Sequence, residues 1–333
     1  MKYNRFLKYF SISFAFILGV TFTINYLFDP LWYFGGNKIQ NHNYAFNERI
    51  SKQNLLKKSI YNCLIMGSSR ATFIKASQLT NANCFNMAFS GGTIDEFIDF
   101  AKVLKSDFDF NIDYLIIGVD LLNFFKKNQP PQFIKNNSTK PPPNFLVAYL
   151  SIDSLKLSKR LFLEQSRLPR IYNSDFEVAM ITQPPEFKPN ESLHGSINGI
   201  FDKAIIDKYI ELNHILNPKK IIYYVPPLSA WHIKEVYRNE LLKDYISGIY
   251  SFVENNLNIV DYSSISEITL DPSNTYDGHH YFPRISALIG RDLNDRLIDH
   301  QPAFDGFGLQ VNKYSYSQYL ERYLLEIQKN YDE

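Results

Sequence analysis

Serine, histidine and aspartate occur in this chain in an order that could carry out acyl transfer. Residues 64–72 read LIMGSSRAT, so an apolar run leads into a glycine and two serines, and Asp277 and His280 follow far along the chain. A serine hydroxyl is a weak nucleophile that needs a base, and a histidine serves when a carboxylate holds its tautomer. Asp277 and His280 are three residues apart, so one turn can bring both to the same rim. We therefore predict a Ser–His–Asp triad.

Five short apolar runs must position these residues. They span residues 62–66, 83–88, 114–119, 220–225 and 257–262. Continuous rather than alternating apolar runs indicate strands buried on both faces, and hence a parallel sheet. Helical patterns lie between or after them, at residues 95–104, 241–255 and 284–297. This alternation predicts an α/β fold, a three-layer α/β/α sandwich with a parallel, flavodoxin-like sheet.

The carboxyl ends of these strands are the expected site, because open parallel sheets bind ligands there. Residues 67–70 (GSSR) follow the first strand, residues 90–93 (SGGT) the second, and Asp120 the third. A serine at a strand-to-helix turn has backbone N–H groups free to hold an oxyanion. Gly91 lets the second loop approach closely and offer another N–H.

The N-terminus predicts a membrane anchor. Residues 9–28 contain no charged residue and follow three basic residues, Lys2, Arg5 and Lys8. Twenty helical residues span about 30 Å, the thickness of a bilayer core. No small-residue cleavage site follows, so we expect an uncleaved signal anchor in lipid rather than a removed signal peptide or a buried soluble helix. The basic flank predicts a cytoplasmic N-terminus, which places the rest of the chain outside the inner membrane, in the periplasm or at the cell surface.

The remaining chain predicts four further segments. Residues 29–56 are a juxtamembrane connection, residues 57–300 the α/β domain, and residues 301–333 a tail whose helix spans residues 314–329. Residues 128–218 interrupt the domain without a convincing core strand and open on a proline-rich stretch. Long insertions of this kind are usually functional, so we expect a cap over the site.

Composition limits the partners and cofactors. The net charge is +1 without a basic block, which argues against nucleic-acid binding. Cys63 and Cys84 could pair outside the cytoplasm or remain buried thiols, and both alternatives stay open. His279 and His280 are adjacent, which is poor geometry for one metal ion, and no further ligand cluster appears. We therefore predict no metal and no cofactor.

The candidate residues resemble a known family. Gly67-Ser68-Ser69, residues 86–93 and Asp277-x-x-His280 are similar to blocks one, two and five of the SGNH (GDSL-type) hydrolases. The resemblance spans roughly residues 60–300. It implies Ser69 rather than Ser68 as nucleophile and His280 as base, oriented by Asp277. It also implies that the N–H groups of Ser69 and Gly91 form the oxyanion hole.

The anchor together with these blocks is similar to the membrane-tethered, cell-envelope branch of that family, which includes polysaccharide O-acetylation and D-alanylation proteins. The resemblance implies a serine esterase or O-acyltransferase that acts on acylated envelope glycans. It also implies a membrane-bound O-acyltransferase as a partner. A lipid esterase, placed near its substrate by the anchor, is a further alternative.

One position departs from the family pattern. The third block carries an asparagine whose side chain completes the oxyanion hole, and here Asp120 stands in its place. An ionised carboxylate cannot donate a hydrogen bond. Either Asn123 or Asn86 substitutes, or Asp120 has another role, such as contacting substrate alongside Arg70 and His279. The departure also favours an alternative, a catalytically impaired envelope protein that binds glycan or the acyltransferase partner.

Overall fold

The chain folds into two compact units, which we describe separately. A computed structural model describes residues 2–40, 47–108, 110–126, 144–163, 170–173, 175–180, 184, 187–189, 200–299 and 306–331. One unit joins Met1–Ser59 to Lys140–Gln183 and is called the N-terminal unit. The other joins Ile60–Thr139 to Pro184–Glu333 and is called the α/β unit.

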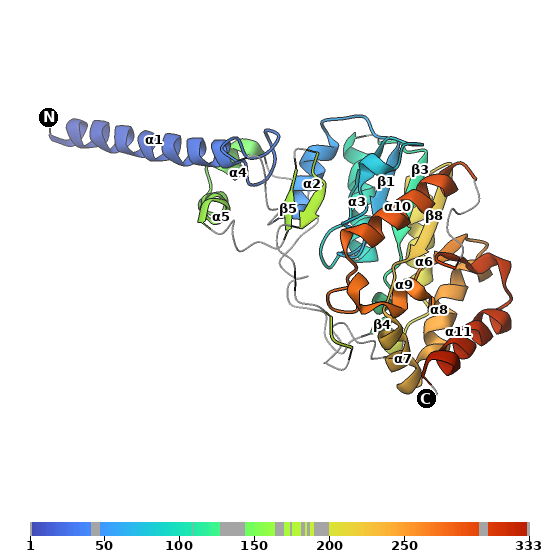
Figure 1. The fold of residues 1–333 in the computed structure, drawn as a ribbon. Coiled ribbons are helices and arrows are strands. Elements are labelled where there is room, and N and C mark those ends of the chain that lie inside the picture. Colours follow the sequence, from blue (N-terminus) through green and yellow to red (C-terminus); the bar gives the residue numbers. More distant parts are fainter. Residues whose placement is uncertain are drawn as a thin grey trace. The chain divides into compact units, whose positions relative to one another are not determined.

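The N-terminal unit begins with the predicted apolar helix. Helix α1 spans Lys2–Phe28 and is long and apolar enough to cross a membrane, with most of its surface exposed (Figure 1). It could therefore serve as a signal or an anchor. The rest of the unit, as far as the structure describes it, comprises three helices and an antiparallel β-hairpin: α2 (Glu48–Leu56), α4 (Phe145–Tyr149), α5 (Ile152–Leu163), β5 (Arg170–Tyr172) and β6 (Val178–Met180).

The α/β unit contains a six-stranded sheet in the order β10-β9-β8-β3-β1-β2. Its strands are β1 (Cys63–Met66), β2 (Cys84–Asn86), β3 (Tyr114–Gly118), β8 (Lys220–Val225), β9 (Ile259–Asp261) and β10 (Leu309–Gln310). All neighbours pair in parallel except β10, which runs antiparallel to β9. The prediction of an α/β fold with a mostly parallel sheet is confirmed. The two-residue edge strand β10 was not predicted.

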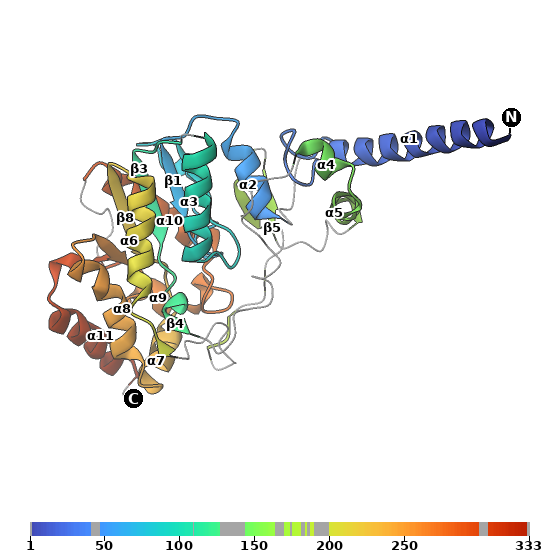
Figure 2. The same ribbon diagram turned by 180° about the vertical axis from the view of Figure 1, so that it is seen from behind.

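Helices lie on both faces of this sheet. Figures 1 and 2, seen from opposite sides, place α3 and α6 in front of one face and α10 in front of the other. Both faces are covered because the central strands are apolar throughout, and every residue of β1 is buried. These three helices are α3 (Ile94–Phe108), α6 (Ile205–Leu216) and α10 (Pro283–Leu297).

The α/β unit has further short elements. Its other helices are α7 (Ala230–Arg238), α8 (Leu242–Glu254), α9 (Glu267–Leu270) and α11 (Tyr316–Tyr331). Strands β4 (Phe125–Lys126) and β7 (Ile200–Phe201) form a separate antiparallel pair, and 3₁₀ turns span Ala76–Gln78, Leu121–Phe124, Pro272–Asn274 and Val311–Lys313.

The two cysteines form a disulfide. Cys63 and Cys84 are register partners on the neighbouring strands β1 and β2, with Cα atoms 4.2 Å apart. The sequence left both pairing and burial as thiols open, and the structure selects pairing. Because disulfides persist in oxidising compartments, the bond suggests that the α/β unit lies outside the cytoplasm.

The predicted insertion at residues 128–218 is divided between the two units. Helices α4 and α5 and the β5–β6 hairpin belong to the N-terminal unit. Helix α6 also falls within the predicted insertion, but it packs against α3 and α8 in the α/β unit. Residues 127–143 and 190–199 lie outside the described residues, and the cap role stays a prediction.

The predicted C-terminal helix is α11, and a buried carboxylate holds it to the sheet. Asp261 ends β9 and accepts hydrogen bonds from the hydroxyls of Tyr319 (2.7 Å) and Tyr323 on α11, and of Ser263 (2.6 Å). Burial raises the pKa of Asp261, and these donors partly offset that rise. The tail therefore packs on its own domain.

Candidate active site

The structure brings Ser69, His280 and Asp277 together. Ser69 Oγ lies 2.7 Å from His280 Nε2, and His280 Nδ1 lies 2.7 Å from an Asp277 carboxylate oxygen. Ser69 and His280 are 211 residues apart in the chain, so only the fold makes this contact. These distances lie within hydrogen-bond reach, as the triad hypothesis requires. The catalytic role of the three residues remains a prediction.

The turn after β1 gives the two serines different surroundings. Ser68 is 6% exposed and its hydroxyl donates to Asp120 Oδ2 at 2.8 Å, whereas Ser69 is partly exposed and faces His280. Gly67 makes the turn possible, because a Cβ at that position would lie 2.6 Å from the Cβ of Ala71. The geometry thus favours Ser69 over Ser68 as the reactive hydroxyl.

Asp277 fixes the orientation of His280 through a tight turn. One oxygen of Asp277 accepts the backbone N–H groups of His279 (2.9 Å) and His280 (2.6 Å), which leaves the other for His280 Nδ1. Burial alone would raise the pKa of Asp277, but these hydrogen bonds and the proximity of His280 lower it below the usual 3.8. An ionised carboxylate only accepts, so it selects the tautomer with hydrogen on Nδ1 and leaves Nε2 to accept from Ser69.

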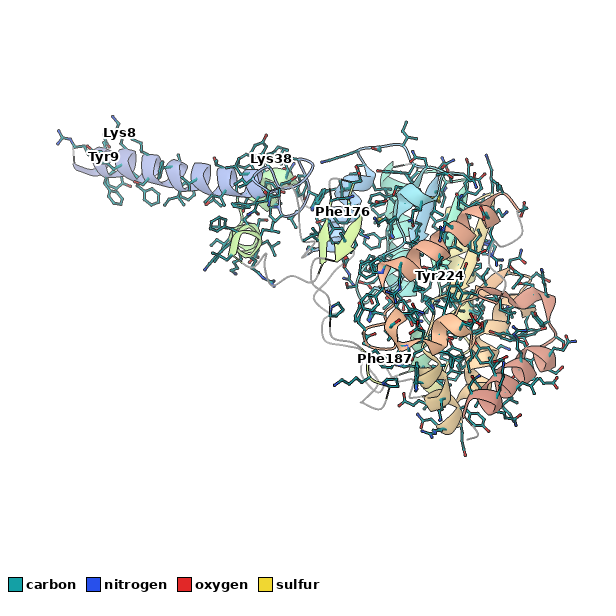
Figure 3. All side chains as sticks on the ribbon, viewed as in Figure 1. Lys8, Tyr9, Lys38, Phe176, Phe187 and Tyr224 are labelled. Atoms are coloured by element: carbon teal, nitrogen blue, oxygen red, sulfur yellow. A yellow bond between two sulfur atoms is a disulfide. The ribbon has the colours of Figure 1, made fainter. Side chains whose placement is uncertain are left out.

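Residues that we did not predict to belong to the site surround the Asp277–His280 turn. The Tyr276 ring stacks on His280 with an interplanar angle of 5°. The ring centroid of His232, which is fully buried, lies 6.2 Å from that of His279. A Cβ at Gly278 would lie 2.8 Å from His232 and 2.7 Å from Phe187, which Figure 3 labels. His232 had no sequence signal, since a single histidine on an amphipathic helix is usually structural.

Two backbone N–H groups, of Ser69 in the turn after β1 and of Gly91 in the loop after β2, are candidate oxyanion donors. Among the described residues, neither Ser69 N–H nor Gly91 N–H has a hydrogen-bond acceptor. Gly91 has φ +63°, a left-handed conformation that glycine adopts without strain. The loop that carries it is tied to the turn after β1, because Phe89 N donates to Gly67 O at 3.1 Å. These two donors are the ones predicted for the oxyanion hole.

The Asp120 carboxylate is bound to the turn after β1. One oxygen accepts from Ser68, and the other pairs with Arg70 Nη1 at 3.2 Å. The Arg70 side chain is 2% exposed, and its Nη2 donates to the carbonyls of Pro226 and Pro227 after β8. The residues on both sides of Ser69 are therefore held by one carboxylate. These contacts favour a positioning role over the substrate contact predicted for Arg70 and Asp120.

Asn86 and Asn123 are the two asparagines predicted as replacement oxyanion donors. Asn86 is buried, and its amide donates to the carbonyls of Ala71 (3.0 Å) and Ile74 (2.7 Å) within the turn that follows Ser69. That amide supports the turn and is not directed to an oxyanion. The Asn123 side chain lies outside the described residues. His279 is 6% exposed, which argues against direct substrate contact.

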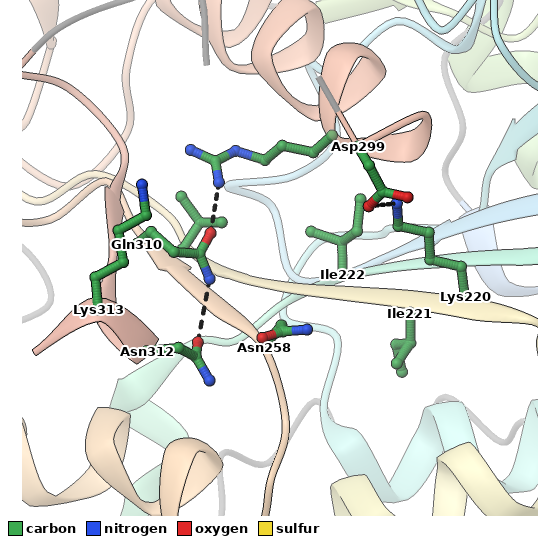
Figure 4. A pocket seen from close by; sticks show the side chains of 10 residues that line it. Lys220, Ile221, Ile222, Asn258, Asp299, Gln310, Asn312 and Lys313 are labelled. Carbon is green, nitrogen blue, oxygen red and sulfur yellow. Dashed lines mark hydrogen bonds and ion pairs between the residues drawn. The ribbon is translucent and has the colours of Figure 1, made fainter. Parts of the chain in front are cut away.

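A pocket of about 310 Å³ lies at the opposite end of the strands (Figure 4). It is lined by the start of β8, whereas Ser69 follows the end of β1, and the two strands run parallel through β3. Lys220 pairs with Asp299, and Arg296 donates to Gln310 at 2.6 Å. Three of its four charged lining residues are ion-paired, Lys220 with Asp299 and Arg296 with Asp292, so we assign it no ligand.

Neither a metal site nor a known relative identifies the chemistry. In the described part of the chain, no group of three or more His, Cys, Asp or Glu side chains is arranged to hold a metal ion. Compared with models of protein families, with curated proteins and with solved structures, the chain matches none. The functional argument therefore rests on the geometry of the site.

Proposed function

We propose that the protein is a membrane-anchored, extracytoplasmic serine esterase or O-acyltransferase of the SGNH type, acting on acylated cell-envelope glycans. The observation that carries the proposal is the Ser69–His280–Asp277 contact at hydrogen-bond distance. The parallel strands lie in the order β2-β1-β3-β8-β9. Counted along the chain among themselves, they have the order 2-1-3-4-5 of doubly wound, flavodoxin-like sheets. Helices on both faces fit a three-layer sandwich.

The reaction follows from the roles of these groups. His280 Nε2 takes the proton of Ser69 Oγ as the oxygen bonds to the ester carbonyl carbon. The carbonyl oxygen becomes an oxyanion, which accepts from Ser69 N–H and Gly91 N–H. The bond to the sugar oxygen breaks as His280 returns the proton to it. Water or an acceptor hydroxyl then attacks the acyl-enzyme, with His280 as base, and Ser69 regains its proton.

The location is supported by two features. The apolar helix α1 follows a basic N-terminus, which favours an anchor with the N-terminus in the cytoplasm. The Cys63–Cys84 disulfide favours an oxidising compartment for the α/β unit. A membrane-bound O-acyltransferase remains the partner that we propose for this arrangement. Only the described parts of residues 128–218 that belong to the α/β unit keep the cap role in this proposal.

An ester-cleavage assay with matched serine variants tests the proposal. We expect the full chain in detergent to release acetate from nitrophenyl acetate and from acetylated oligosaccharides. Ser69→Ala should abolish release, whereas Ser90→Ala, which alters an exposed serine on the neighbouring loop, should leave it unchanged. Equal thermal unfolding of the two variants would exclude misfolding. Equal activity of Ser69→Ala and wild type would contradict the proposal, and preference for long-chain esters would favour a lipid esterase instead.

A binding protein that has lost hydrolysis is the second candidate function, and Asp120 is the observation that favours it. The position that should supply an oxyanion donor holds an acceptor engaged with Arg70. Losing one such donor costs about 2.7–4 kcal/mol of transition-state stabilisation. A folded protein that binds acetylated oligosaccharides but releases no acetate would identify this second function.

A further inference from the structure

The short helices α4 and α5 present an apolar surface that no described part of the N-terminal unit covers. The exposed residues include Val147 (68%) on α4 and Ile152 (70%) and Leu163 (58%) on α5. We call α4 and α5 with their connection the helical hairpin. Helix α4 has only five residues, so it cannot be a stable element by itself and needs a surface to pack on.

The hairpin packs on the last turns of α1. The Tyr149 ring contacts Phe22, and the Phe162 ring contacts Phe28. These two positions on α1 are six residues apart, or about 9 Å at 1.5 Å per residue. The hairpin therefore lies beside the final part of the apolar helix rather than beyond its end.

A polar residue within α1 depends on this contact. Asn25 is fully buried, its amide donates to the Tyr149 carbonyl at 2.8 Å, and its carbonyl accepts from Ser158 Oγ at 2.8 Å. An unsatisfied amide at bilayer depth is costly, so a partner is needed there. The hairpin supplies that partner at the depth of Asn25.

Aromatic and basic side chains mark the level of a membrane surface. Tyr26 and Phe34 contact edge to face, and Lys38, labelled in Figure 3, places its ammonium 4.5 Å from the centre of the Tyr26 ring. Aromatic rings and lysine stems gather at bilayer interfaces because one end is apolar and the other polar. Helix α5 adds Lys156, Lys159 and Arg160 to the same unit.

We propose that the helical hairpin lies in the lipid of the membrane that α1 spans, with Val147, Ile152 and Leu163 among the acyl chains. Interfacial helices insert about 5–10 Å, which matches the 9 Å of α1 that the hairpin covers. The long stems of the basic residues on α5 let their charged ends reach the headgroups while the apolar residues lie among the acyl chains. The inference rests on the anchor in the proposed function. It adds a second lipid contact, which fixes the membrane-proximal unit instead of leaving it on a single flexible tether.

Fluorescence quenching in nanodiscs tests this surface. The full chain, one copy per disc of phosphatidylethanolamine and phosphatidylglycerol, would carry one NBD label on an introduced cysteine, with the native disulfide kept oxidised. Val147→Cys and Ile152→Cys test the hairpin. Phe14→Cys reports on the anchor, and Leu325→Cys, an exposed apolar position on α11, reports on water. Quenchers are lipids with a doxyl group high on the acyl chain, and aqueous iodide.

We expect labels at positions 147 and 152 to lose intensity with doxyl lipid and to be protected from iodide, as at position 14, while position 325 shows the reverse. Iodide quenching at positions 147 and 152 with lipid quenching at position 14 would overturn the inference and leave the anchor intact. Protection only in discs that hold two copies would overturn it in favour of a self-association surface. Absence of lipid quenching at position 14 would overturn the anchor and the inference together.

Discussion

The two units bury polar side chains in different ways. In the α/β unit, Ser68, Arg70 and Asp120 gather at the carboxyl edge of an otherwise apolar sheet, beside Ser69. In the N-terminal unit, buried polar residues run along α2 and include Lys52 at 1% exposure. Tyr172 on β5 donates to Glu48 on α2, so these groups fasten separate segments of the chain. We therefore take buried polar side chains as a sign of a reactive site only where they surround a partly exposed group such as Ser69.

The largest effect should come from Asp277→Asn. An amide cannot select the same histidine tautomer, so we expect ester turnover to fall about 10³–10⁴-fold. The free energy of unfolding should fall only modestly at neutral pH, because the turn keeps an acceptor for its backbone N–H groups but loses the ionised carboxylate. Asp207→Asn, an exposed change on α6, is the matched control and should leave turnover unchanged. Turnover within a factor of three of wild type would refute the role of Asp277.

The same carboxylate predicts a pH effect on stability. The pKa of Asp277 is lowered in the folded state, so its contribution is fully present above the usual 3.8 and is lost as the pH falls through the lower folded value. Urea unfolding of wild type and Asp277→Asn should therefore converge only below pH 3.8. Curves that already coincide at neutral pH would contradict a stabilising ionised Asp277.

The next effect concerns Asp120. Replacing it with asparagine restores the donor of the family pattern but leaves Arg70 buried without its ion-pair partner. We expect the free energy of unfolding to fall by about 3–5 kcal/mol and turnover to fall with it. Denaturant titration with a turnover assay checks both. Asp113→Asn, which breaks the exposed pair with Lys219, should be nearly silent. Higher turnover at unchanged stability would contradict the positioning role of Asp120 and show that its only effect is the loss of an oxyanion donor.

Removing the disulfide should have a smaller effect, confined to the α/β unit. Cys63 and Cys84 are 21 residues apart, and closing a loop of that length stabilises by about 3 kcal/mol in the chain-entropy model. Cys63→Ser with Cys84→Ser, in a Trp32→Phe background, would be followed by Trp231 fluorescence during denaturation. No change in the denaturation midpoint would contradict a structural role for the bond.

The smallest effect should appear in the N-terminal unit at alkaline pH. Burial lowers the pKa of Lys52 to about 8 from 10.5, and Glu48 partly offsets this. Between these values the unfolded chain binds more protons, so stability rises with pH. Trp32 fluorescence in a Trp231→Phe background reports this unit. Lys52→Met should flatten the dependence, and an equal slope in that variant would assign it to another group.

The sequence predicted those parts of the fold that local patterns encode. Strands β1, β3 and β8 are unbroken apolar runs, and their ends carry Ser69 and Asp120. Strand β10 has two residues and exists only through pairing with β9, so no local pattern reveals it. The contact between Asn25 and Ser158 joins residues 133 apart, which explains why α5 was assigned to a cap rather than to the N-terminal unit.

Local sequence patterns likewise predicted only part of the site. The spacing of Asp277 and His280 and the GSS turn are visible in one dimension, so the proximity of three residues could be predicted. The partner of Arg70 could not, because Asp120 lies 50 residues away and either residue alone suits substrate binding. His232 was missed for the same reason, since its neighbour His279 comes from another segment.

The central claim is that Ser69 is a nucleophile activated by His280. The most direct measurement is peptide mapping after treatment of the full chain with a fluorophosphonate, which reacts only with activated serines. The account predicts one adduct, on Ser69, that is lost in His280→Ala and kept in Ser90→Ala. No adduct on the folded protein, or an adduct on Ser68 or another serine, would contradict it.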